Sequence, residues 1–230
     1  MRWIITILIA LSAGFAGAAA WDFANLGPDH TRNYLMANPE VLPEAIAELQ
    51  RREMVERIGP LRPELETPFP GAVLGNPEGS ITLVEFSDYA CGFCRQSLAD
   101  VRALVAANPD LKVVIREYPI LSGDSAAAAR MALAAAEQGK YEAFHNAMFA
   151  QDGPSPESIE AAATQVGVDL TQATAAIDAG RYESQLENNV FLGQSLQLSG
   201  TPAWIVGDRV LNGAVGAQEI GVAIAEARDS

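Results

Sequence analysis

The fold is indicated most clearly by the stretch Ile81-Thr-Leu-Val-Glu-Phe-Ser-Asp-Tyr-Ala-Cys91-Gly-Phe-Cys94-Arg95. This stretch holds both cysteines of the 230-residue chain, and its apolar pattern changes from that of a strand to that of a helix. The apolar, β-branched run at 81–86 predicts a buried strand, and the residues after Cys91 repeat apolar side chains at helical spacing. Three residues apart at the start of a helix, Cys91 and Cys94 share one face and can form a disulfide. Unpaired N–H groups and the helix dipole favour a thiolate at Cys91. The pattern therefore indicates a redox-active pair.

The first twenty residues have the composition of an export signal. One positive charge at Arg2 is followed by an apolar run and then by small residues ending at Ala20, which predicts a signal peptide over 1–20, cut before Trp21. The alternative is an uncleaved membrane anchor, because the apolar run approaches the length that spans a bilayer. We therefore expect the mature protein in the periplasm.

The mature chain is acidic and poor in cysteine. Without residues 1–20 it has 14 Lys and Arg against 29 Asp and Glu, a formal net charge of −15. Nucleic acid and anionic membrane surfaces are poor partners for such a chain. Two cysteines three residues apart do not make a structural disulfide framework, so the pair indicates chemistry in an oxidising compartment.

Residues 21–66 predict an N-terminal helical arm. Leu42, Ala45, Ile46 and Leu49 form one apolar stripe, and Met54, Val55, Ile58 and Leu61 form a second one, turned by roughly 120°. A helix that is apolar on two sides needs partners. The arm either makes a homo-oligomer or folds back on its own domain.

A catalytic domain is expected over 67–230. The turn-rich segment 64–80 is interpreted as a linker, and residues 111–118 predict a second strand parallel to the first. A helical insertion is expected over about 124–198, capped at its start by Asp124 or Ser125. The further elements expected are helices at 126–138, 140–150, 155–166, 170–178 and 182–198, strands at 203–207 and 209–211, and a helix at 217–228.

This order is the α/β plan of a thioredoxin fold with an inserted helical subdomain. The mature chain resembles the DsbA-like branch of exported thioredoxin-fold thiol–disulfide oxidoreductases, in the Com1-like or ScsC-like subgroup with an N-terminal helical arm. The matching stretches are Asn38-Pro-Glu-Val-Leu, Leu74-Gly-Asn-Pro-Glu-Gly, Leu83-Val-Glu-Phe-Ser-Asp-Tyr-Ala-Cys-Gly-Phe-Cys-Arg, Glu117-Tyr-Pro-Ile-Leu, Gly139-Lys-Tyr-Glu-Ala-Phe-His and Gly200-Thr-Pro-Ala.

Cys91 is the expected nucleophile and Cys94 the resolving thiol. The resemblance implies that Gly92 and Phe93 tune the redox potential, and without a histidine between the cysteines we expect a less oxidising disulfide. It also implies that Thr201-Pro202 is a cis-proline turn facing the pair, and that Glu85 is a buried acid that moves the proton of Cys94. The alternative for Glu85 is a position on a solvated face of the strand.

Other polar and aromatic residues are expected to be structural. Asp88 is interpreted as a turn or capping residue, His145 as a packed histidine, and Trp204 and Phe191 as core residues. A zinc site is disfavoured, because zinc takes about four ligands and His30 and His145 are the only histidines. An inert disulfide would close too short a loop to stabilise the fold. No metal or cofactor is expected.

The sequence thus predicts a periplasmic thiol–disulfide oxidoreductase acting on exported proteins, isomerase-like or reductase-like, and recycled by a membrane redox partner. Two alternatives stay open. One is a monomeric disulfide donor, and the other is a Cu(I)-binding or chaperone module in which the dithiol holds the soft metal.

Overall fold

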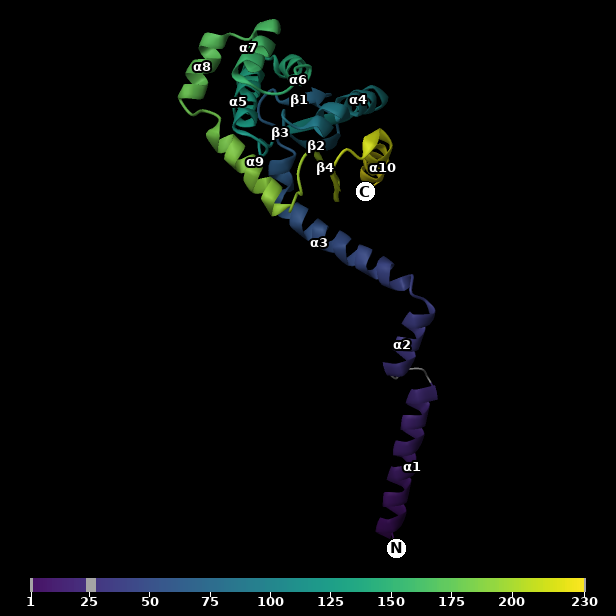
Figure 1. The fold of residues 1–230 in the computed structure, drawn as a ribbon. Helices are drawn as coiled ribbons and strands as arrows, with labels where there is room; N and C mark the ends of the chain where they lie inside the picture. Colours follow the sequence, from purple (N-terminus) through teal and green to yellow (C-terminus); the bar gives the residue numbers. More distant parts are fainter. Residues whose placement is uncertain (1, 24–27, 230) are drawn as a thin grey trace. The chain divides into compact units, whose positions relative to one another are not determined.

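The computed structural model describes residues 2–23 and 28–229, and it divides after Gln50 into two units. The N-terminal unit contains α1 (Arg2–Phe23), α2 (Pro28–Ala37) and the start of α3 (Val41–Leu65). Within the described residues, one helical segment, Trp3–Trp21, is long and apolar enough to cross a membrane, a property that signal sequences near an N-terminus share. The second unit holds everything from Arg51 onward (Figure 1).

A five-stranded sheet forms the centre of the second unit. Its strands are β1 (Val73–Gly75), β2 (Ile81–Ser87), β3 (Leu111–Glu117), β4 (Ala203–Val206) and β5 (Arg209–Asn212), in the spatial order β1-β3-β2-β4-β5. β2 and β3 pair in parallel, as expected for strands joined by a helix, and the other pairs are antiparallel. The two central strands are nearly continuous apolar runs because helices cover both of their faces.

The edge strand β1 lies inside the segment that we interpreted as a linker. The turn chemistry in this segment is real, because Gly75 has a positive φ of 73°, a conformation that glycine adopts without cost. Val73, Leu74 and Gly75 itself nevertheless pair with β3. A strand this short carries too little periodicity to be recognised among prolines and glycines.

Seven helices of the second unit follow β2 in the chain. They are α4 (Gly92–Ala107), α5 (Gly123–Glu137), α6 (Tyr141–Phe149), α7 (Pro156–Gln165), α8 (Leu170–Asp178), α9 (Glu183–Ser195) and α10 (Gly216–Arg228). α5 to α9 make the predicted insertion between β3 and β4, with α5 to α8 gathered together (Figure 1). Ser122, rather than Asp124 or Ser125, caps α5, because its hydroxyl accepts the Ser125 N–H.

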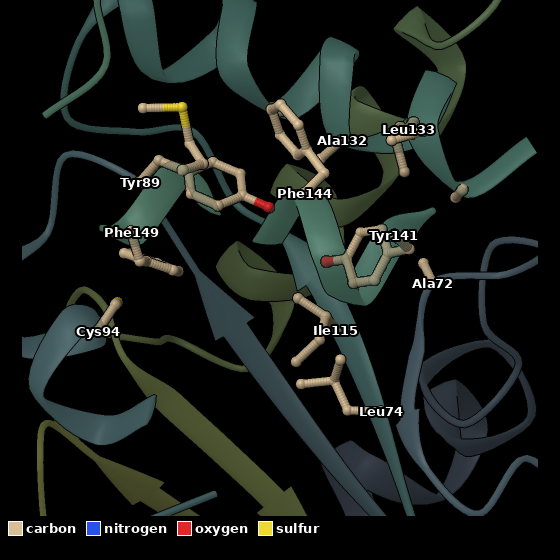
Figure 2. Packing of buried hydrophobic residues seen from close by; sticks show 14 of the residues in the cluster. Ala72, Leu74, Tyr89, Cys94, Ile115, Ala132, Leu133, Tyr141, Phe144 and Phe149 are labelled. Atoms are coloured by element: carbon tan, nitrogen blue, oxygen red, sulfur yellow. The ribbon is translucent and has the colours of Figure 1, made fainter. Parts of the chain in front are cut away.

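Alternation along β2 divides the apolar core between the two faces of the sheet. Leu83 packs with residues of α4, α5, α6 and α10, part of which Figure 2 shows, whereas Val84 and Phe86 pack with α3 and α9. Trp204 is fully buried, as expected. Phe191 is 56 % exposed, which corrects its assignment to the core, because α9 turns the adjacent Leu192 inward instead.

The second apolar stripe of α3 packs against its own domain. Ile58 and Leu65 are buried against the second face of the sheet, with Met54 and Leu61 partly buried beside them. Residues 51–65 therefore belong to the compact unit, which corrects the expectation that they lie in the arm. The helix also continues through Pro60 and Pro63 to Leu65.

Candidate functional site

The two cysteines lie at the start of α4, after the turn that follows β2. Cys91 is the N-cap residue of α4, with extended backbone, and its Sγ accepts the Cys94 N–H at 3.4 Å. The sulfur therefore sits at the positive end of a 16-residue helix, where a thiolate is stabilised. Both cysteines are free thiols in this structure. Cys91 is 8 % exposed and Cys94 is 1 % exposed, so the first sulfur is the more accessible one.

The Thr201–Pro202 turn faces Cys91 from a segment 110 residues away. The Cys91 thiol donates to the Thr201 carbonyl at 3.2 Å, and the Thr201–Pro202 peptide bond is cis, as the resemblance implied. The turn leads directly into β4, which is paired with β2, so the central strands fix its place beside the thiol.

Glu85 lies on β2 beneath the pair and is 2 % exposed. Burial raises its pKa to about 8, partly offset by the nearby Ser87 hydroxyl. Burial also raises the pKa of Cys94, and the charge of Glu85 raises it further. Glu85 and Cys94 are thus electrostatic neighbours, and each disfavours the negative charge of the other.

Gly92 and Phe93, between the cysteines, leave the first turn of α4 open. A Cβ on Gly92 would meet no atom within 4 Å, and Phe93 is 61 % exposed. Neither residue can donate a side-chain hydrogen bond to the Cys91 sulfur.

Asp88 organises the turn that carries Cys91. Its carboxylate accepts the N–H groups of Ala90, Ile120 and Leu121 at 2.8 to 3.0 Å, and its carbonyl accepts the Cys91 N–H at 3.0 Å. Asp88 is buried, so these bonds replace the water it has lost. This is the structural role predicted for it.

Two buried charged residues at the end of β3 were not singled out in the sequence. The Arg116 guanidinium donates to the carbonyls of Glu64, Leu65 and Thr67, where α3 ends, and to the Asn189 side chain. Burial lowers the Arg116 pKa to about 10. On the opposite face, Glu117 accepts the hydroxyl protons of two tyrosines. In the sequence, an Arg-Glu pair at the end of a strand looks the same whether its side chains are buried, as here, or exposed to solvent.

The structure thus brings together Cys91, Cys94, Glu85 and the Thr201–Pro202 turn, and it places His145 in the core nearby. Among the described residues there is no group of three or more His, Cys, Asp or Glu side chains that could hold a metal ion. The chemistry available to the site is that of a dithiol with a buried acid beneath it.

Two family models match the chain. The model described as "DSBA-like thioredoxin domain" matches residues 82–225, which contain every site residue named above. The model described as "Copper resistance protein ScsC N-terminal domain" matches residues 32–54, in α2 and the first half of α3.

Solved structures share the fold. A thioredoxin-like oxidoreductase from Silicibacter pomeroyi is 42 % identical, with a TM-score of 0.66 over 69 % of this chain and 92 % of that chain. The thiol–disulfide exchange protein alpha-DsbA2 from Wolbachia pipientis is 28 % identical, with a TM-score of 0.70 over 77 % and 97 %. BcfH from Salmonella enterica Typhimurium is 26 % identical, with a TM-score of 0.66 over 93 % and 99 %.

Among curated relatives, the Na(+)/H(+) antiporter NhaA 3 of Salinispora tropica is 28 % identical over 158 residues, covering 67 % of this chain and 24 % of that protein. The chain spans about a quarter of the length of the curated relatives it matches.

Proposed function

The chain belongs to the DSBA-like thioredoxin domain family, with an ScsC-type segment before the domain, and from this premise we propose that it exchanges disulfides of exported proteins in the periplasm. The observation that carries the proposal is the position of the Cys91 sulfur. It caps α4, contacts the Thr201 carbonyl beside a cis-proline, and is more exposed than Cys94. The apolar N-terminal helix supports export.

In the reducing direction, the Cys91 thiolate attacks a client disulfide and forms a mixed disulfide, and the second client sulfur leaves as a thiolate. Cys94 then loses its proton and attacks the Cys91 sulfur, which releases the first client thiolate. The client disulfide has gained two electrons, which the two protein thiols have lost in forming the Cys91–Cys94 disulfide. In isomerisation a client thiolate displaces Cys91 instead, and no net electrons move.

Glu85 is the proposed acceptor of the Cys94 proton. A buried carboxyl with a pKa near 8 holds or releases a proton at neutral pH, and a general base is most effective when its pKa lies near the working pH. While Glu85 is ionised, its charge opposes a thiolate at Cys94, and transfer of the Cys94 proton to Glu85 removes that charge.

We propose the isomerase or reductase direction over disulfide donation. The side chains of Gly92 and Phe93 provide no hydrogen bond to a Cys91 thiolate, so the reduced form is less stabilised than in a strongly oxidising pair. A membrane redox partner that supplies electrons would keep the pair reduced.

The first stripe of the arm, Leu42, Ala45, Ile46 and Leu49, is proposed to make a homo-oligomer. Leu42, Ile46 and Leu49 are each about half exposed, whereas the second stripe is occupied by its own domain. The match of 32–54 to an ScsC N-terminal domain covers this stripe.

Insulin reduction and refolding of scrambled ribonuclease test the exchange activity, with Cys91→Ser as the control that removes the nucleophile. The Cu(I)-binding alternative draws on the matched family's description as a copper resistance protein and on the affinity of thiolates for Cu(I). A protein that only binds copper would fail both assays, and Cu(I) would still protect both thiols from alkylation.

A further inference from the structure

A second buried polar cluster lies beside the exchange centre, and the proposed chemistry does not use it. It consists of Glu117 at the end of β3, Tyr89 in the turn before Cys91, and Tyr141 and His145 on α6. All four side chains are at most 2 % exposed. The hydroxyl groups of Tyr89 and Tyr141 point towards each other among the surrounding apolar side chains (Figure 2).

Hydrogen bonds join the four side chains into one network. The Tyr141 hydroxyl donates to Glu117 Oε1 at 2.7 Å, and the Tyr89 hydroxyl donates to the same oxygen at 3.1 Å. The Tyr89 oxygen also lies 3.1 Å from His145 Nδ1. The other ring nitrogen of His145, Nε2, is buried and makes no hydrogen bond with the described part of the chain.

These hydrogen bonds allow two consistent proton arrangements, because Tyr89 has only one hydroxyl proton. When Glu117 is a carboxylate, Tyr89 donates to it, and His145 Nδ1–H must donate to Tyr89. When Glu117 is protonated, it can donate to Tyr89, which then donates to His145 Nδ1, and the ring proton moves to Nε2. The second arrangement holds one more proton, and the imidazole is neutral in both.

The groups around Glu117, Tyr89 and His145 favour interconversion of these two proton arrangements near neutral pH. Burial raises the Glu117 pKa to about 8, the two tyrosine hydroxyls oppose this rise, and the charges of Asp88 and Glu85 add to it. Burial, followed by the charge of Arg102 on α4, lowers the His145 pKa to about 3, so the ring does not ionise. Two buried carboxyls, Glu85 and Glu117, lie on the same face of the sheet, and the charge of Glu85 raises the pKa of both Glu117 and Cys94.

We propose that Glu117, Tyr89 and His145 form a buried proton switch that makes the thiol–disulfide equilibrium of Cys91 and Cys94 depend on pH. Glu117 is a positioning residue in this scheme, because it acts through Tyr89 and through its charge. The proposal rests on the exchange function proposed above. Glu117, Tyr89 and His145 would then regulate the exchange reaction of Cys91 and Cys94 through pH.

The direction of the effect follows from charge. A Cys91 thiolate is negative and the disulfide is neutral, so ionised Glu117 disfavours the reduced form. As pH rises through the switch, the equilibrium therefore shifts towards the disulfide. Glu117→Gln removes the charge and keeps an oxygen that can accept both tyrosine hydroxyls.

The first test measures the equilibrium of the full mature protein with glutathione from pH 6 to 9. At pH 6 we expect the Glu117→Gln variant to match the unmodified protein, and at pH 9 to be more reduced, on the order of threefold to tenfold. Glu137→Gln is the matched control, because Glu137 also accepts a tyrosine hydroxyl, that of Tyr182, outside this cluster. An equal shift at all pH values, or none, overturns the proposal.

The second test observes the ring of His145 directly by ¹⁵N NMR. The chain has two histidines, so a His30→Gln variant assigns the remaining signals to His145. The neutral ring is expected to change from Nε2–H to Nδ1–H as pH rises through about 8. Tyr89→Phe and Glu117→Gln are each expected to abolish the change. A tautomer that stays constant overturns the switch.

The two proposals fail differently. If the protein does not exchange disulfides with glutathione or insulin, the proposed function fails. If exchange is normal and the pH dependence is the same in the Glu117→Gln variant, only the switch fails.

Discussion

Replacing Glu85 by Gln is expected to stabilise the oxidised protein at alkaline pH and to leave its stability nearly unchanged at pH 5. In the unfolded chain the carboxyl ionises near pH 4.5, whereas burial keeps it protonated in the folded protein up to about pH 8. Between these values the folded state binds more protons, so the free energy of unfolding falls as pH rises. Glutamine does not ionise and escapes this loss.

The size of the effect follows from the shift. A pKa unit corresponds to roughly 1.4 kcal/mol, so a rise from 4.5 to about 8 corresponds to roughly 3 to 5 kcal/mol once the carboxyl is fully ionised. Glu85 is 2 % exposed, so solvent screens little of this energy. The oxidised form is the right one to measure, because its cysteines cannot titrate.

Urea unfolding followed by circular dichroism from pH 5 to 9 measures both proteins. Glu183→Gln is a suitable control. The Glu183 carboxylate pairs with Arg130, which lowers its pKa, so that carboxyl is ionised in both states across this range and its replacement adds no slope. If the stabilities of the unmodified protein and the Glu85→Gln variant run parallel from pH 5 to 9, Glu85 is not a buried acid with a raised pKa. Glu85 then cannot be the acceptor of the Cys94 proton that we propose.

Four further outcomes are expected. Cys94→Ser is expected to trap the mixed disulfide between Cys91 and an insulin chain, visible by non-reducing electrophoresis, whereas rapid release would contradict the resolving role. Removal of the chain up to Gln50 is expected to lower the mass measured by light scattering to that of a folded monomer. Removal up to Glu66 also takes away two buried aliphatic side chains and is expected to cost at least about 3 kcal/mol of stability in urea; equal stability of the two truncations would contradict this. Arg116→Met leaves carbonyls at the end of α3 without their donor and is expected to cost about 2 to 4 kcal/mol by the same measurement, whereas a loss below about 1 kcal/mol would contradict the role of the guanidinium.

The architecture around the cysteines was predictable because its signals are local. A β-branched run followed by helical spacing places Cys91 at the start of a helix, and the structure has it as the N-cap of α4. The helical insertion is equally periodic, and its ends were predicted within a few residues. The place of Thr201 beside Cys91 came from the family resemblance, because no local pattern connects residues 110 apart.

The rest depends on contacts that no local pattern records. The two stripes of α3 look alike in sequence, yet Ile58 packs on its own sheet and Ile46 is exposed, a difference that only the tertiary fold decides. Glu117 and His145 are ordinary polar residues in the sequence, and their link through Tyr89 arises because the tertiary fold brings α6 residues within hydrogen-bonding distance of Tyr89 and Glu117. Phe191 failed as a core prediction because its helix shows little amphipathic pattern.

Arg116 and Glu117 are neighbours on β3 that serve opposite faces of the sheet. Arg116 donates to the carbonyls at the end of α3, whereas Glu117 accepts the hydroxyl proton of Tyr89, two residues before Cys91. The peptide unit between Arg116 and Glu117 therefore connects the end of α3, on one face of the sheet, to the buried polar cluster beside the exchange centre on the other face.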